Sequence, residues 1–223
     1  GDVTIDPLLF FMITKDLGKG AFGTVKLGTH IVSGECVAIK QFDKYKVLSL
    51  HKSQGFSIED PDALYEHEAR LVERLQDHDC IIKMYQSIST AKKVHLILDY
   101  CTQDLAEYVR AKTRVPEAEA ASLFAQILGV VAHCHSNNVV HRDLKLDNIM
   151  LDYVDGPLSL PQVRLIDFGM GEVVRSNRKL RMQCGTPAFA SPEMWMDKPY
   201  FGQKNDVWSL GVMLYVCVVG QVC

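Results

Sequence analysis

The chain has 223 residues, with 27 acidic and 24 basic side chains, a formal net charge of -3 and a hydrophobic content of 48%. This composition excludes a disordered segment, a collagen-like fibre and a disulfide-stapled miniprotein, and a chain of this length can bury about 70% of its unfolded surface. The near-neutral charge argues against nucleic acid or an acidic membrane as the main partner, because both favour an excess of lysine and arginine.

The first part of the chain has the pattern of an antiparallel sheet. Over residues 10–40, Val25, Leu27, Val37 and Ile39 fall in alternation around a Ser-Gly turn signal at residues 33–34. The polar residues 49–62 predict a loop, and residues 63–75 carry leucines at helical spacing, so we expect one helix beside the sheet.

The second part of the chain is predicted to be mainly helical. Residues 94–99 indicate one more strand and residues 100–103 a short connector. Pro116 then begins a helix in which Leu123, Ile127, Val130 and Cys134 line one face. The change of pattern near residue 101 predicts an α+β fold of two lobes joined by a hinge.

No segment indicates export or a membrane span. Residues 1–14 lack the features of a signal peptide, and the longest apolar run, residues 210–219, is about half of a spanning helix, so a buried core helix is expected there. The 7 cysteines are scattered and include no C-x-x-C pair, as is typical of reduced thiols. We therefore expect an intracellular, cytoplasmic location.

A glycine-rich segment is the first motif that carries chemistry. Residues 17–25 contain the pattern G-x-G-x-x-G-x-V, in which glycines let a strand-turn-strand backbone close over phosphates. A Rossmann site would need a helix directly after the last glycine, whereas Thr24 to Leu27 favour a strand, and a Walker loop would end in G-K-[ST], which is absent.

The second motif is Val37-Ala38-Ile39-Lys40, a strand that ends in a lysine. A carboxylate could hold the Lys40 ammonium toward phosphates, and the following helix offers Glu66 and Glu68. We expect Glu68 to be the partner, because its spacing places it beside the apolar stripe of that helix.

Two further motifs are His141-Arg142-Asp143 followed by Asn148, and Asp167-Phe168-Gly169. With the first two motifs, in this order, the sequence resembles the eukaryotic protein kinases from about residue 11 to residue 219. The resemblance implies one kinase domain over residues 1–223, with an N-lobe over about 10–100 and a C-lobe over about 101–223.

The resemblance also implies roles for individual residues. Asp143 matches the catalytic aspartate, Lys145 would stabilise charge on the γ-phosphoryl group, and Lys40 with Glu68 would orient the phosphates of ATP. Asn148 and Asp167 would hold magnesium. The remaining nucleotide contacts implied are Leu17, Gly18, Lys19, Gly20, Ala21, Phe22, Gly23, Val25, Ala38, Asp99, Cys101, Asp104 and Met150, with Leu98 as gatekeeper.

The resemblance is closest to serine/threonine kinases. Lys145 follows Asp143 at the position typical of that class, and Thr186 is expected to contact both residues. The segments C-G-T-P, S-P-E and D-V-W-S-L-G, the last at the start of a buried helix from Asp206, resemble the calcium/calmodulin-dependent kinase group. Its SNF1/AMP-activated branch and its Pim-like branch both stay open.

The histidines near the catalytic motif have structural interpretations. His133 and His135 could suggest a metal cluster, but they lie at the end of a helix that supports the catalytic loop in the resembling family. His141 is expected to pack against Phe168.

The segment after Gly169 departs from the family pattern. Met182 and Gln183 occupy the positions where many relatives carry a phosphorylatable residue that would pair with Arg142, and only Ser176, Thr186 and Ser191 are hydroxylated in this stretch. We therefore expect activity without phosphorylation at the usual site. The segment is also basic, and a solvated loop is the simplest interpretation of its charges.

Two more features qualify the resemblance. The chain stops at Cys223, so we expect an incomplete C-lobe, a Glu193 without its usual arginine partner and an exposed apolar patch. Residues 152–162 form an insertion that is expected to be a surface turn.

The sequence predicts an ATP- and magnesium-dependent kinase that acts on serine or threonine in proteins. The alternative is a non-catalytic, nucleotide-binding scaffold, which the shortened C-lobe would favour and the presence of Asp143 disfavours. A small-molecule kinase is disfavoured by the segment around Thr186.

Overall fold

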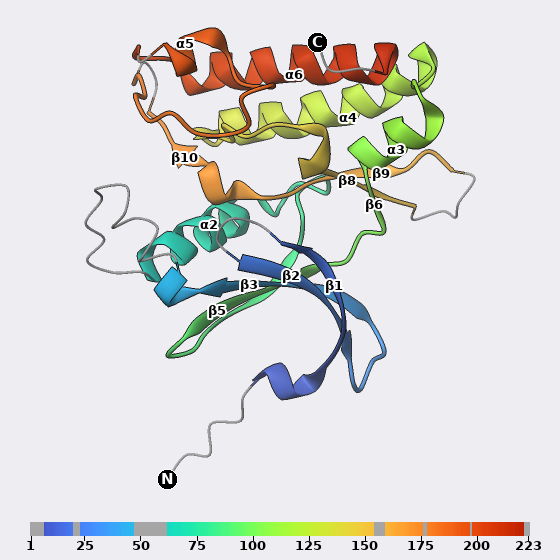
Figure 1. Ribbon diagram of the computed structural model, residues 1–223, viewed down its shortest axis with the longest axis vertical. Helices are drawn as coiled ribbons and strands as arrows, with labels where there is room; N and C mark the ends of the chain where they lie inside the picture. The colour runs from blue at the N-terminus through green and yellow to red at the C-terminus, as the bar shows by residue number, and fades with distance from the viewer. Residues whose placement is uncertain are drawn as a thin grey trace. The chain divides into compact units, whose positions relative to one another are not determined.

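The structure of the protein is a computed structural model (Figure 1), and it describes residues 7–19, 23–46, 62–153, 159–175, 178–196 and 198–220. The chain forms two compact units. The first comprises residues 1–73 and 83–100, and the second comprises residues 74–82 and 101–223. The mixed α+β class expected from the sequence is confirmed.

The first unit is built on a five-stranded antiparallel sheet with the order β1-β2-β3-β5-β4. Among the described residues, its helical elements are a short 3-10 turn, a helical stretch at residues 44–46 and the helix α2, which continues into the second unit. The bounds are η1 (Pro7–Phe10), β1 (Phe11–Lys19), β2 (Gly23–His30), β3 (Cys36–Asp43), α2 (Asp62–Leu75), β4 (Met84–Ser89) and β5 (Lys93–Asp99).

The predicted sheet, helix and strand of this unit are confirmed, whereas β4 is absent from the sequence-based prediction. Only Met84 and Ile88 of β4 are buried, and the polar residues between them hide the strand pattern. Gly34 closes the β2–β3 hairpin with a φ of 75°, a left-handed conformation that glycine adopts without strain. The predicted loop over residues 49–62 lies, up to residue 61, outside the described residues.

The second unit is mainly helical, with short strands between the helices. Its elements are β6 (Gln103–Asp104), α3 (Leu105–Lys112), α4 (Glu117–Ser136), β7 (Val139–Val140), η2 (Leu146–Asn148), β8 (Ile149–Asp152), β9 (Gln162–Leu165), η3 (Phe168–Met170), β10 (Glu172–Val173), α5 (Pro192–Trp195) and α6 (Gly202–Val219). The strands form one sheet of order β6-β8-β9 and one of order β10-β7.

Helix α4 forms where the sequence predicts it. Pro116 occupies the N-cap with a φ of -56°, one position before the helix proper. Leu123, Ile127, Val130 and Cys134 are at most 1% exposed, so the predicted apolar face is buried. Helix α6 lies beside α4 in Figure 1.

Helix α6 corrects one expectation, because it begins at Gly202 rather than at Asp206. Asp206 lies within the helix, and its carboxylate accepts bonds from another segment instead of capping the helix. Gly202 lies against Val140, whose side chain is 2.8 Å from where a Cβ would be.

The apolar end of α6 is buried on one side. Leu210, Met213, Val216 and Cys217 are buried, while other apolar side chains of residues 210–219 are exposed, including Leu214. Among the described residues, no helix has the length and apolar content to cross a bilayer.

Candidate active site

In the second unit, a buried carboxylate anchors the loop that carries His141, Arg142 and Asp143. Asp206 is 0% exposed and accepts from the backbone N–H groups of His141 and Arg142, at 3.0 and 2.8 Å. His135 Nε2 donates to the same carboxylate at 2.9 Å. These hydrogen bonds offset the free-energy cost of burying the carboxylate, and they fix the conformation of the loop backbone.

The loop turns sharply where it meets the segment before Thr186. Arg142 has a φ of 67°, which is unusual for a residue with a side chain. Gly185, at a φ of 82°, approaches so closely that a Cβ there would lie 2.4 Å from the Arg142 carbonyl oxygen. Glycine at position 185 therefore lets the two segments touch.

His141 has a structural role, as expected. Its ring lies 5.0 Å from the ring of Phe168, measured between centroids. Its Nε2 donates to the Ile166 carbonyl at 3.0 Å, and its Nδ1 accepts from Asp143 N at 3.3 Å. This pattern selects the neutral tautomer protonated on Nε2.

Three predicted residues of the second unit converge on Asp143. Thr186 Oγ1 donates to Asp143 Oδ1 at 2.8 Å, and Lys145 Nζ lies 3.1 Å from Asp143 Oδ2 and 3.2 Å from Thr186 Oγ1. Asn148 Nδ2 donates to the Asp143 carbonyl at 2.8 Å. The expected contacts of Thr186 with Asp143 and Lys145 are confirmed.

Asn148 and Asp167 offer oxygen ligands suited to magnesium. Ile166 N donates to Asn148 O at 3.1 Å, which brings the chain before Asp167 beside Asn148. Because Asn148 Nδ2 donates to Asp143, its amide oxygen is the atom available to a cation. Asp167 has a φ of 64°, a strained conformation of the kind found at functional sites.

The donor set fits a magnesium ion that is shared with phosphates. Within the described part of the chain, no group of three or more His, Cys, Asp or Glu side chains could hold a metal. Magnesium usually takes one or two protein ligands and completes its shell with phosphates and water. His135 Nε2 lies 2.9 Å from Asp206 Oδ2, and His133 Nε2 lies 3.1 Å from Asp77 Oδ1.

In the first unit, the structure brings Lys40 and Glu68 together. Lys40 Nζ lies 2.7 Å from Glu68 Oε1, and the two side chains are 18% and 6% exposed. The rival Glu66 instead pairs with Arg70 on the surface, at 3.2 Å. Glu68 is therefore the partner of Lys40.

Two glycines of the glycine-rich segment, Gly18 and Gly23, have different surroundings. A Cβ at Gly23 would lie 1.9 Å from the Gln41 carbonyl oxygen, so the sheet itself requires glycine there. A Cβ at Gly18 would meet no atom of the described residues within 4 Å, so these residues leave room for a ligand beside Gly18. Gly20, Ala21 and Phe22 lie outside the described residues, and Leu17 and Lys19 are exposed.

The remaining predicted nucleotide contacts of the first unit lie on adjacent strands. Val25 is opposite Lys40 and Ala38 is opposite Leu98, and all four are partly exposed. Asp99 uses its backbone N–H to donate to the Lys83 carbonyl at 3.0 Å and its side chain to accept from Tyr85.

In the second unit, Asp104 has a role that sequence reasoning missed. Its Oδ1 accepts from Glu107 N at 2.7 Å, so it caps α3. Burial raises the pKa of Asp104, and the bond from Glu107 N opposes that shift. Met150 is opposite Asp104 between β6 and β8, and Cys101 is buried.

A second missed feature is the surroundings of Arg142. Its side chain is 6% exposed, Nε donates to the Met170 carbonyl at 2.6 Å, and Nη2 lies 3.7 Å from Glu172 Oε2. Arg178 Nη1 lies 3.9 Å from the other oxygen of Glu172. Glu172 thus places a carboxylate beside Arg142, the arginine that a phosphate in this segment was expected to bind. Ser176 lies outside the described residues.

Comparisons with known proteins agree with this arrangement. The family model described as Protein kinase domain matches residues 11–223. The chain is 36% identical over 206 residues to the carbon catabolite-derepressing protein kinase of Candida glabrata. The aligned region covers 92% of this chain and 31% of that protein.

Two further relatives show the same extent of similarity. Sperm motility kinase 3A of Mus musculus is 37% identical over 213 residues, covering 95% of this chain and 38% of that protein. The SNF1-related protein kinase catalytic subunit alpha KIN12 of Arabidopsis thaliana is 36% identical over 213 residues, covering 95% of this chain and 40% of that protein. The chain spans about a third of the length of the curated relatives it matches.

Proposed function

The chain belongs to the protein kinase domain family, and from this we propose that it transfers the γ-phosphoryl group of ATP to serine or threonine hydroxyls of proteins. The observation that carries the proposal is the convergence of Lys145, Thr186 and Asn148 on Asp143. The SNF1-related name of the relative from Arabidopsis thaliana supports the SNF1 branch of the two branches expected.

Asp143 is proposed to orient the acceptor hydroxyl and accept its proton. Thr186 donates to one of its carboxylate oxygens, which leaves the carboxylate in a defined orientation. Lys145 lies beside the same carboxylate at 3.1 Å and supplies positive charge where negative charge would develop on the transferred group.

Lys40, oriented by Glu68, would bind phosphate oxygens, and Asn148 and Asp167 would hold Mg²⁺, whose charge offsets that of the phosphates. The other proposed contacts are Leu17, Gly18, Lys19, Gly20, Ala21, Phe22, Gly23, Val25, Ala38, Asp99, Cys101, Asp104 and Met150. The open space at Gly18 supports this proposal.

The test compares phosphate transfer from ATP to a peptide mixture by the wild type and by Asp143→Ala. We expect the substitution to lower the rate at least about a hundredfold, the usual contribution of a positioned base. Asp147→Ala is the matched control, because Asp147 lies in the same loop but is exposed. Equal rates for the wild type and Asp143→Ala would instead support the non-catalytic scaffold.

A further inference from the structure

The segment that leads to Thr186 and the chain near Tyr200 carry exposed cations that form no ion pair within the described residues. The group consists of Lys179, Arg181, Lys198 and Lys204, which we call the cation cluster, and all four side chains are exposed. In the described part of the chain, none of them forms an ion pair with a carboxylate.

A two-residue bridge fixes the segment that carries Lys179 and Arg181. Leu180 and Tyr200 exchange two backbone hydrogen bonds, of 2.8 and 2.9 Å, and both side chains are buried. Side chains alternate along extended chain, so Lys179 and Arg181 point away from that buried pair. Lys198 lies two residues before the bridge.

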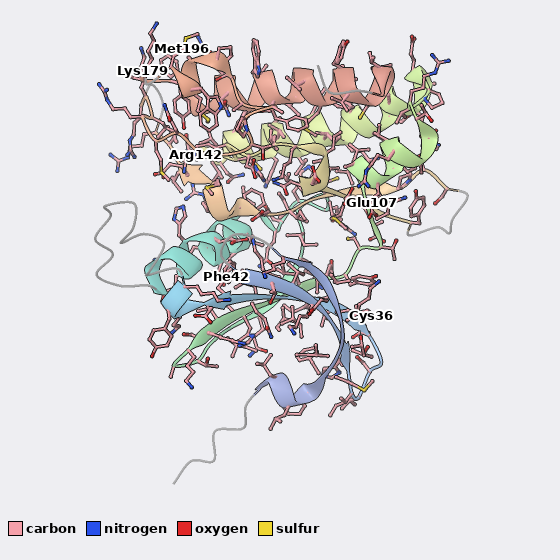
Figure 2. All side chains as sticks on the ribbon, viewed as in Figure 1. Cys36, Phe42, Glu107, Arg142, Lys179 and Met196 are labelled. Atoms are coloured by element: carbon pink, nitrogen blue, oxygen red, sulfur yellow. The ribbon has the colours of Figure 1, made fainter. Side chains whose placement is uncertain are left out.

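An aromatic ring brings two of the cations together. Lys179 Nζ and Lys204 Nζ each lie 5.2 Å from the centroid of the Phe201 ring. Each ammonium is attracted by the ring, but the two repel one another. Figure 2 shows Lys179 and Met196 at the α5 end of this unit. An anion that binds near the two lysines would offset their repulsion.

Arg181 of the cation cluster lies within a short peptide length of Asp143. Thr186 Oγ1 donates to Asp143 at 2.8 Å, and Arg181 precedes Thr186 by five residues. Five residues of extended chain span at most about 18 Å. A substrate with its hydroxyl at Asp143 can therefore place a side chain about five positions away, or nearer, on the cluster.

We propose that the cation cluster binds acidic side chains of the protein substrate and so selects acceptor sites near aspartate or glutamate. This inference rests on the proposed function and specifies its substrate class. A peptide is favoured over a nucleic acid or an anionic membrane because the cluster is small and close to Thr186, while the chain as a whole has a net charge of -3.

The test uses two fluorescent acceptor peptides that differ only in acidic residues, or their amides, within about five positions of the serine. For the wild type, we expect the acidic peptide to have a KM and a Kd lower by about tenfold. The preference should shrink as salt rises from about 50 to about 300 mM, because salt screens exposed charges.

The test variant is Lys179→Gln with Arg181→Gln and Lys204→Gln, and it should lose the preference while retaining its rate on the amide peptide. The matched control is Lys83→Gln with Arg110→Gln and Arg114→Gln, which removes the same charge from exposed positions elsewhere. The control should keep the preference.

Three results would overturn the proposal. The first is that the wild type binds both peptides with equal affinity. The second is that the test variant keeps the preference for the acidic peptide. The third is that the test variant loses binding to RNA or to anionic vesicles but not to the acidic peptide. Fluorescence anisotropy measures peptide binding without turnover. A wild type that transfers no phosphate therefore refutes the proposed function, whereas anisotropy still decides the role of the cluster.

Discussion

At the scale of single residues, the site depends on buried charges that have partners from distant parts of the chain. Arg142 is the clearest case, because its side chain is 6% exposed and adjoins the proposed catalytic Asp143. Glu172, on β10, supplies the carboxylate nearest to it. We infer that Glu172 is a positioning residue that acts on Asp143 through Arg142.

Glu172→Gln is expected to lower kcat by about tenfold and to leave the KM for ATP within about twofold. The amide keeps the shape of the side chain but leaves a buried cation without its counter-ion, which is strongly unfavourable. Steady-state kinetics measure the split between kcat and KM. Glu117→Gln, at an exposed position in the first turn of α4, is the control, and an unchanged kcat in Glu172→Gln would refute the role.

Alkaline pH is expected to destabilise the second unit. Burial raises the pKa of Cys134 and of Cys217 from the usual 9.0 to about 12. Above about pH 9 the unfolded chain loses these protons while the folded chain keeps them, so the free energy of unfolding falls as pH rises, by up to about 1.4 kcal/mol per pH unit for each thiol.

Urea unfolding from about pH 7 to about pH 10 measures this slope. Cys217→Ala removes one of the two thiols and should make the slope shallower, whereas Cys36→Ala, at an exposed position, should not change it. A free energy of unfolding that stays constant over this range would show that the buried thiols do not determine the alkaline limit.

At the scale of elements, the β1–β2 pair combines a structural glycine with a glycine that faces open space. A Cβ at Gly23 would lie 1.9 Å from the backbone of β3, while a Cβ at Gly18 would meet nothing within 4 Å. The packing of the sheet therefore requires glycine at position 23, whereas position 18 concerns only the space for a ligand.

Gly23→Ala is expected to destabilise the protein by about 1 to 3 kcal/mol, because β3 must move to admit the methyl group. That loss lowers Tm by several degrees, at about 2 to 4 °C per kcal/mol, in a thermal melt. Gly18→Ala should keep the wild-type Tm but raise the KM for ATP. The structural distinction would be wrong if the two variants melted at the same temperature.

At the scale of the whole molecule, local patterns predicted much of the fold. Alternation identified the β2–β3 hairpin, and helical spacing identified α2 and α4. The polar strand β4 and the short helix α3 were missed, because their few apolar residues repeat too little to form a pattern. The predicted start of α6 was wrong because Asp206 serves a distant loop rather than its own helix.

The residues of the candidate site that belong to sequence motifs could be predicted. Those whose role depends on contacts between distant residues were harder to predict. The choice of Glu68 over Glu66 followed from helical spacing, and the structure pairs Lys40 with Glu68. The ion pair between Glu172 and Arg142 joins residues that no periodic sequence pattern relates. The cap formed by Asp104 could have been recognised, since an aspartate before an apolar helix start is a capping signal.

The buried carboxylate of Asp206 also sets the order in which the centre can mature during synthesis. The ribosome makes His141 first and Asp206 65 residues later, so the nascent loop has no anchor during that interval. Emergence of α6 from the exit tunnel is then the step that lets Asp206 anchor the backbone of His141 and Arg142.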